Sequence, residues 1–210
     1  MKNYTTIPNS FATKLNSADM YRYTALSFTP RKDGYTDSTF KQIGEYINAE
    51  IPESEETVKD FTRRLKDSKL INIEEVFENG KKRNHYYIAE PISNYRIIKS
   101  ELLKVNLPVE LKGFMIQLST ITYNNTLEVN LNISQIVKLI KISNKTAGRY
   151  IKELLEAKYL IKSDSGYILS DKYFDTGKTP KTKVIEKILK EIKGCEYLED
   201  RYNKTDWSKI

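Results

Sequence analysis

Histidine and cysteine are almost absent from this sequence of 210 residues, which contains one of each, His85 and Cys195. A zinc site of His and Cys ligands needs several such side chains, and a Cys–His or Ser–His–Asp catalytic set needs a histidine beside a nucleophile. Only His85 acting alone remains for such chemistry. Because a single cysteine forms no internal disulfide, an intracellular protein is expected. We therefore expect no metal site, no cofactor, no catalytic residue and no enzymatic activity.

Long apolar runs are missing as well. Polar side chains are spread over residues 1–15, which leaves no apolar core for a signal peptide. No segment of the chain approaches the roughly 20 apolar residues of a membrane span. We expect a soluble cytoplasmic protein that makes no contact with a membrane.

Positive charge is in excess. The sequence has 35 Lys and Arg against 28 Asp and Glu, which gives a net charge of +7, and its pI is about 9.2. Such an excess favours a polyanionic partner such as nucleic acid. A lysine surplus that only keeps the protein in solution explains the charge equally well, so composition leaves both interpretations open.

An internal repeat organises the chain. Six positions from Tyr4 to Leu26 recur between Tyr95 and Gln117 at an offset of 91, and five of the six pairs keep apolar character. Four positions from Thr57 to Lys69 recur between Thr146 and Lys158 at an offset of 89. Two copies of one module are the simplest explanation. The predicted domains are residues 1–90 (the first repeat), residues 91–172 (the second repeat), and a linker with a C-terminal amphipathic helix at 173–210.

Both repeats predict three helices followed by a β-hairpin. Apolar spacing, polar caps and the turn sequence Asn79-Gly80 define these elements. The elements expected in the first repeat are helices at 19–28 and 40–47, a third helix capped by Ser54, and strands at 72–77 and 85–89. Those expected in the second repeat are a helix at 109–122, a strand at 127–131, a helix at 134–141, a third helix capped by Ser143, and a short hairpin at 161–169.

This order is that of a winged helix-turn-helix. The sequence therefore predicts a mainly α fold with small β-hairpin wings (α+β), built from two tandem winged helix-turn-helix domains plus a C-terminal helix. That last helix, at 181–193, carries an apolar stripe. The stripe either packs back on the second repeat or forms a homodimer.

Three segments of the second repeat resemble one family. Tyr95–Leu103, then Leu111-Lys112-Gly113, then Thr146–Leu160 are similar to the N-terminal winged-helix domains of plasmid and phage replication initiators (replisome organisers). Lys158 departs from the glycine usual in that family, and with the first repeat the resemblance covers about 170 residues. The resemblance implies binding of double-stranded DNA, at a replication origin or, because repressors share the fold, at a promoter.

The third helix of the second repeat provides the predicted base-reading surface. In a winged helix this helix enters the major groove with its first turns against the base edges. Asn144, Lys145, Thr146 and Arg149 all carry hydrogen-bond donors, and Arg149 suits guanine as Asn144 suits adenine. Lys152 lies on the same outer side of the helix.

The first repeat is less suited to DNA at the start of its third helix. Glutamates at positions 53, 55 and 56 suit the helix dipole there but repel phosphates. Its hairpin carries consecutive cations that can reach phosphates or a minor groove, and the expected fold favours this contact over the alternative of a solvated turn. The further DNA-binding residues predicted in this repeat are Lys59, Arg63 and Arg64 on the helix, and Lys81, Lys82, Arg83, Asn84 and His85 on the hairpin.

Alternatives to origin binding stay open. A transcriptional repressor with the same domains is one, and a winged-helix protein-interaction scaffold is another. In a third, the acidic first repeat contacts protein and only the second repeat binds DNA. The sequence indicates no small-molecule ligand.

Overall fold

The structure is a computed structural model that describes residues 3–29, 34–78, 80–89, 91, 93–122 and 126–176. Of Lys81 it describes the backbone within a strand but not the side chain. The C-terminal helix expected at 181–193, residues 177–180 of the predicted linker and Cys195 lie outside the described residues, whereas linker residues 173–176 are described and include a strand at Phe174–Asp175. In the described part of the chain no helix is long and apolar enough to cross a membrane.

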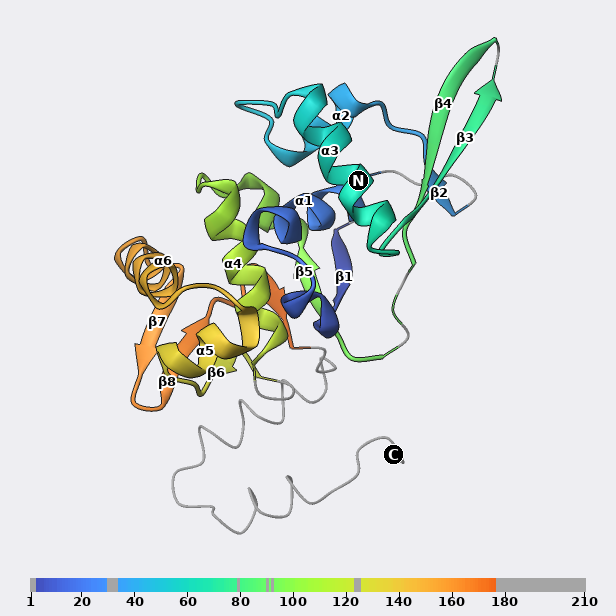
Figure 1. Ribbon diagram of the computed structural model, residues 1–210. Helices are drawn as coiled ribbons and strands as arrows, with labels where there is room; N and C mark the ends of the chain where they lie inside the picture. Colours follow the sequence, from blue (N-terminus) through green and yellow to red (C-terminus); the bar gives the residue numbers. More distant parts are fainter. Residues whose placement is uncertain are drawn as a thin grey trace, which may run out of the picture. The chain divides into compact units, whose positions relative to one another are not determined.

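The first repeat folds as a helix, a short strand, two helices and a hairpin (Figure 1). Ser54 caps the third helix, as predicted, because its side chain accepts the backbone N–H of Thr57. The second helix begins with a capping box in which Thr39 and Gln42 each bond the other's backbone N–H. The elements are α1 (Ser17–Ser27), β2 (Tyr35–Thr36), α2 (Phe40–Ile47), α3 (Glu55–Asp67), β3 (Asn72–Glu78) and β4 (Lys81–Tyr87).

The same order of elements returns in the second repeat. Ser143 caps the third helix, as predicted, and Asn132 with Gln135 forms the capping box of the helix before it. The elements are α4 (Val109–Thr120), β6 (Glu128–Val129), α5 (Ile133–Ile140), α6 (Asn144–Glu156), β7 (Leu160–Ser163) and β8 (Gly166–Leu169).

A third sheet joins the two repeats. Its central strand β5 (Tyr95–Lys99) pairs antiparallel with β1 (Tyr4–Pro8) and with β9 (Phe174–Asp175). A short 3-10 helix follows each of the two longer strands, η1 (Asn9–Thr13) after β1 and η2 (Ser100–Lys104) after β5. The inward side chains Ile7 and Ile98 are fully buried, so this sheet closes one side of the core.

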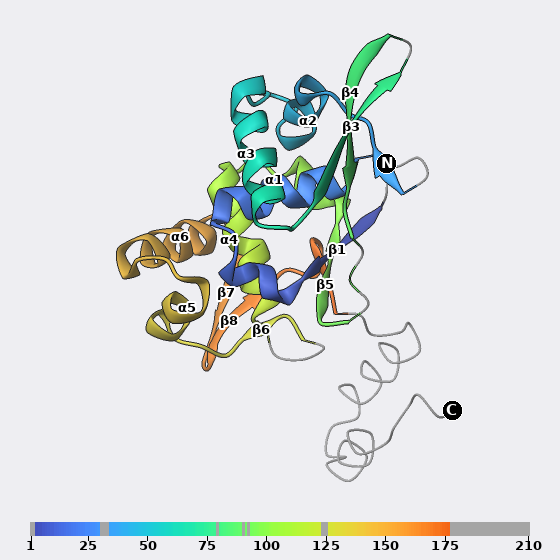
Figure 2. The same cartoon turned by 45° about the vertical axis from the view of Figure 1, so that its right-hand side comes forward.

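The helices α1 and α4 pack against each other at the centre of the molecule (Figure 2). A Cβ added to Gly113 of α4 would lie 1.5 Å from the carbonyl oxygen of Ser17, so only glycine permits this crossing. The Ser17 hydroxyl donates to Gln117 of α4 at 2.7 Å, and both side chains are buried. One hydrophobic core contains side chains from both repeats, and residues 1–176 form one compact unit. The domain boundaries at 90 and 172 stay a prediction.

The predicted fold class is wrong. The described residues form six α-helices and three three-stranded antiparallel sheets, which is an α+β fold and not a tandem of winged helices with small hairpin wings. Each hairpin gains a third strand, β2 or β6, and β1–β5–β9 forms a sheet outside both hairpins. The prediction missed this sheet because β9 is two residues long and pairs with a strand more than 70 residues away, so no local pattern indicates the pairing.

Candidate nucleic-acid interface

From the start of α5 to Lys152 in α6 the chain carries positive charge alone, and Glu153 and Glu156 follow in the last turn of α6. Residues 133–152 contain five Lys and Arg and no Asp or Glu. All five cations are exposed, and Lys141 ends α5 in the left-handed conformation that turns the chain into α6. With exposed Asn144 they make up what we name the α5–α6 surface, which consists of Lys138, Lys141, Asn144, Lys145, Arg149 and Lys152.

The sequence of α6 buries one side and exposes the other. Ala147, Tyr150, Ile151 and Leu154 recur at helical spacing and are all buried, so the positions between them face outward. The first turn of α6 holds no acidic residue. The positive end of the helix dipole therefore adds to the field of the cations.

The charged heads on α6 are weakly engaged. Arg149 lies 3.9 Å from Glu153, and Lys152 lies 3.8 Å from Glu156, with the two cationic side chains 64% and 76% exposed. Exposed pairs of this kind contribute about 0.3–0.5 kcal/mol on a helix. A phosphate or a base edge can displace them at small cost. Thr146, predicted with this group, instead has its hydroxyl 2.8 Å from that of Ser143 and belongs to the helix cap.

The corresponding helix of the first repeat has different electrostatics. Glu55 and Glu56 occupy the first turn of α3, and the exposed Arg63 donates to Asp60 at 2.9 Å. Lys59 is exposed on the same helix. A phosphate approaching α3 therefore meets carboxylates first.

Arg64 has a structural role that the sequence did not reveal. Its guanidinium donates two hydrogen bonds to Asp19 of α1, at 2.8 and 3.0 Å, and these bonds raise the pKa of Arg64. Asp19 is buried and also accepts a bond of 3.0 Å from Arg22, which in turn pairs with Glu53. This network fixes α3 against α1. Asp19 and Arg64 stand 45 residues apart, so no local motif indicates their contact.

Two cations of the β3–β4 hairpin, Lys82 and Arg83, lie close to carboxylates. Lys82 contacts Glu75 at 2.6 Å and lowers the pKa of that carboxyl, while Arg83 lies 3.6 Å from Asp37. The strand register creates the first contact, which the run of cations in the sequence does not show.

The two polar residues that follow are engaged within the hairpin sheet. Asn84 donates to the hydroxyl of Tyr86 at 3.4 Å. His85 is buried and stacks on Tyr35 with ring centroids 3.8 Å apart, and its Nε2 lies 3.3 Å from Glu78. This position gives the single histidine of the chain a packing role.

The predicted DNA-binding residues therefore do not form one surface. Those of the second repeat lie together on α6, whereas those of the first repeat are divided between α3 and the β3–β4 hairpin. Figures 1 and 2 place α6 and the far end of that hairpin on opposite sides of the α1–α4 pair. The sequence prediction also left out Lys138, in the last turn of α5, and Lys141, which ends that helix; both belong to the α5–α6 surface.

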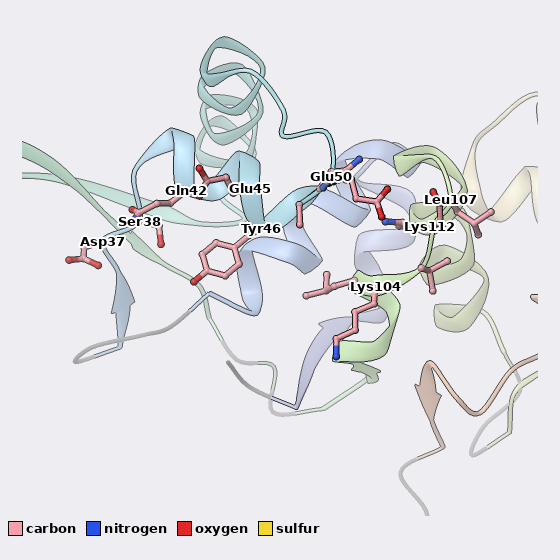
Figure 3. A pocket seen from close by; sticks show the side chains of 14 residues that line it. Asp37, Ser38, Gln42, Glu45, Tyr46, Glu50, Lys104, Leu107 and Lys112 are labelled. Atoms are coloured by element: carbon pink, nitrogen blue, oxygen red, sulfur yellow. Dashed lines mark hydrogen bonds between the residues drawn. The ribbon is translucent and has the colours of Figure 1, made fainter.

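A cleft of about 780 Å³ lies between α2 with the residues after it and the segment 103–107 that leads into α4 (Figure 3). Its lining includes both signs of charge, with Glu45 and Glu50 beside Lys104 and Lys112. Lys112 is 4% exposed and donates to the hydroxyl of Tyr21 at 3.3 Å. Burial lowers the pKa of Lys112, against the opposing effect of Glu50. Among the described residues no group of three His, Cys, Asp or Glu side chains is placed to hold a metal ion.

Comparisons with known proteins add little. No model of a known protein family matches the sequence, and no curated protein matches it. Among solved structures, a chain of the "Nse1-Nse3-Nse4 complex" aligns with 75% of this chain and 69% of its own length, at 12% identity and a TM-score of 0.26. Similarity at that TM-score supports no inference about fold or function.

Proposed function

We propose that this protein binds double-stranded DNA through the α5–α6 surface. The observation that carries the proposal is the charge of residues 133–152, a stretch with five exposed cations and no Asp or Glu, in which only Arg149 and Lys152 have weak ion pairs with glutamates that follow it. Folding alone gives no reason for this arrangement, because the equivalent stretch of the first repeat folds into the same two helices with acidic residues among its cations. A polyanion is the partner that such a surface attracts.

The dimensions of α6 suit a DNA groove. A helix of 13 residues is about 20 Å long and fits the major groove, which admits one α-helix. Lys138 and Lys141 flank the start of α6 and would contact phosphates. Asn144, Lys145 and Arg149 on its first two turns would face base edges, where arginine pairs with guanine and asparagine with adenine.

The test is a selection of bound fragments from random duplex DNA, followed by affinity measurements over a range of salt concentrations. Arg149→Ala is expected to weaken specific binding by about 1–3 kcal/mol and to relax sequence preference. Arg63→Ala is the matched control, because Arg63 is 67% exposed and makes one helix ion pair, as Arg149 does. The control is expected to bind DNA as the wild type does.

Two outcomes contradict the proposal. One is a wild-type protein that enriches no fragment and shows no affinity that falls with salt. The other is equal loss of affinity in the Arg149 and Arg63 variants, because that result assigns binding to overall charge and not to the α5–α6 surface.

The biological role follows from where the selected sequence occurs. On the resemblance to plasmid and phage replication initiators, we propose a replication origin as the target. A site that overlaps a promoter would instead assign the protein to transcriptional regulation.

A protein-interaction scaffold is the second candidate, and one feature of the first repeat favours it. Phe77 is 80% exposed near the end of the β3–β4 hairpin, whereas the other six phenylalanines of the chain are buried or pack on the core. Exposed aromatic side chains often anchor protein interfaces. The failure of wild-type protein to bind duplex DNA would make this candidate the leading one.

A further inference from the structure

Gly148 occupies a position where the fold has no need of glycine. It lies within α6, in ordinary helical conformation, and a Cβ added there would meet no atom within 4 Å. Glycine inside a helix lowers stability relative to alanine because the unfolded chain gains more conformational freedom. The sequence therefore accepts a cost at this position that the folded chain alone does not explain.

The other glycines in the described part of the chain each have an internal reason. A Cβ on Gly44, Gly113 or Gly166 would lie within 2.4 Å of a backbone oxygen. Gly34 and Gly80 have positive φ angles, at 87° and 73°, which favour glycine in turns. Gly148 has neither a close neighbour nor a positive φ.

The first repeat supplies an internal comparison. The helices α3 and α6 both have 13 residues and both follow a serine cap. The fifth residue of α6 is Gly148, and the fifth residue of α3 is Lys59, whose side chain is exposed. The same helical position in the same chain thus accepts a long side chain when it faces solvent.

Four polar side chains surround Gly148 on the helix. Lys145 and Lys152 lie three residues before it and four after it, Asn144 lies four before it, and Arg149 follows it, and all four are exposed. Between them Gly148, which is partly exposed, leaves helix backbone without a side chain on the cationic face. An anionic macromolecule held by these side chains can approach the backbone more closely at this point than elsewhere on α6.

We infer that Gly148 marks the point where the backbone of α6 lies directly against the base edges of bound duplex DNA. This inference rests on the proposed function and adds the depth at which the helix sits in the groove. Without a Cβ at position 148, α6 enters far enough for the shorter side chain of Asn144 to reach the bases. A methyl group at this position holds the helix outward and lengthens each of those contacts.

The experiment compares Gly148→Ala and Gly148→Gln with the wild type, by thermal unfolding and by affinity for the selected duplex. Alanine is expected to raise the melting temperature by about 2–4 °C and to weaken DNA binding about 5-fold or more. Glutamine is expected to weaken binding further, since it adds bulk without adding charge. Both variants should fold, because the position is open.

The pair Lys59→Ala and Lys59→Gly is the matched control at the equivalent position of α3. Both variants lose the same charge, so the glycine variant is expected to melt lower than the alanine variant and to bind DNA with the same affinity as the alanine variant. This comparison separates helix stability from binding. A Gly148→Ala protein that melts higher and binds as tightly as the wild type overturns the inference and leaves the proposed function standing. A wild-type protein without salt-dependent DNA affinity overturns both.

Discussion

The ion pair between Asp19 and Arg64 gives a prediction that separates folding from DNA binding. Asp19 is 5% exposed and accepts three hydrogen bonds from the guanidiniums of Arg22 and Arg64, at 2.8–3.0 Å. Asp19→Asn keeps the shape of the side chain but leaves two cations without this carboxylate. The expected perturbation is therefore one of charge within unchanged packing.

The magnitude follows from the surroundings of each partner. Removal of one member of a buried pair costs about 3–5 kcal/mol. Arg22 keeps Glu53 as a partner, and the side chain of Arg64 is 49% exposed, so solvent relieves part of the loss. We expect Asp19→Asn to lower the free energy of unfolding by about 2–3 kcal/mol and Arg64→Ala by about 1 kcal/mol.

Urea denaturation of the two single variants and the double variant measures the coupling between the side chains. A coupling free energy of about 1 kcal/mol is expected, because the double variant loses their interaction only once. Two additive single effects, or a loss below about 0.5 kcal/mol for Asp19→Asn, would refute this reasoning. Arg64→Ala should bind duplex DNA as the wild type does, since its guanidinium serves α1 and not the α5–α6 surface.

Two further predictions concern the contact between α1 and α4 and the cleft beside it. Gly113→Ala places a methyl group against the carbonyl of Ser17, so the free energy of unfolding, measured with heat or urea, is expected to fall by about 3 kcal/mol or more. A fall below about 1 kcal/mol would show that the two helices can move apart to accept the methyl group. Burial lowers the pKa of Lys112 in the folded protein. The unfolded chain therefore binds the proton of the Lys112 ammonium group more tightly than the folded chain does. As a result, the free energy of unfolding rises with pH between the lowered pKa and the ordinary lysine value of about 10.4. Lys112→Met should stabilise the fold at neutral pH by about 1 kcal/mol and flatten that alkaline rise, whereas an unchanged slope would assign the rise to other groups.

Local patterns in the sequence predicted most of the helices. The caps at Ser54 and Ser143 were identified correctly because a polar side chain before an apolar-periodic segment marks a helix start without reference to the rest of the fold. The β3–β4 hairpin was found through Asn79-Gly80 for the same reason. The sheet β1–β5–β9 and the packing of Gly113 against Ser17 depend on partners far away in the sequence, so the predicted fold class was wrong.

In the candidate site, too, local patterns were predictable and contacts between distant residues were not. The outward side of α6 was predictable, because its buried residues follow helical spacing and leave Lys145 and Arg149 exposed. The partners of the first-repeat cations were not predictable. Arg64 meets a carboxylate on α1, and Arg83 meets one beside β2, through contacts that only tertiary packing creates. Runs of cations in a sequence do not reveal which of them already have an acidic neighbour.

The sheet that joins the repeats has a consequence for how the chain folds during synthesis. Its first strand, Tyr4–Pro8, is made about 90 residues before its partner β5, and β5 in turn precedes its second partner β9, which ends at Asp175. Until β5 is made, β1 has no strand to pair with, and the closing of so large a loop carries an entropic cost that local helices avoid. We expect the nascent chain to form its helices in order and to complete its core late, when the last strand arrives.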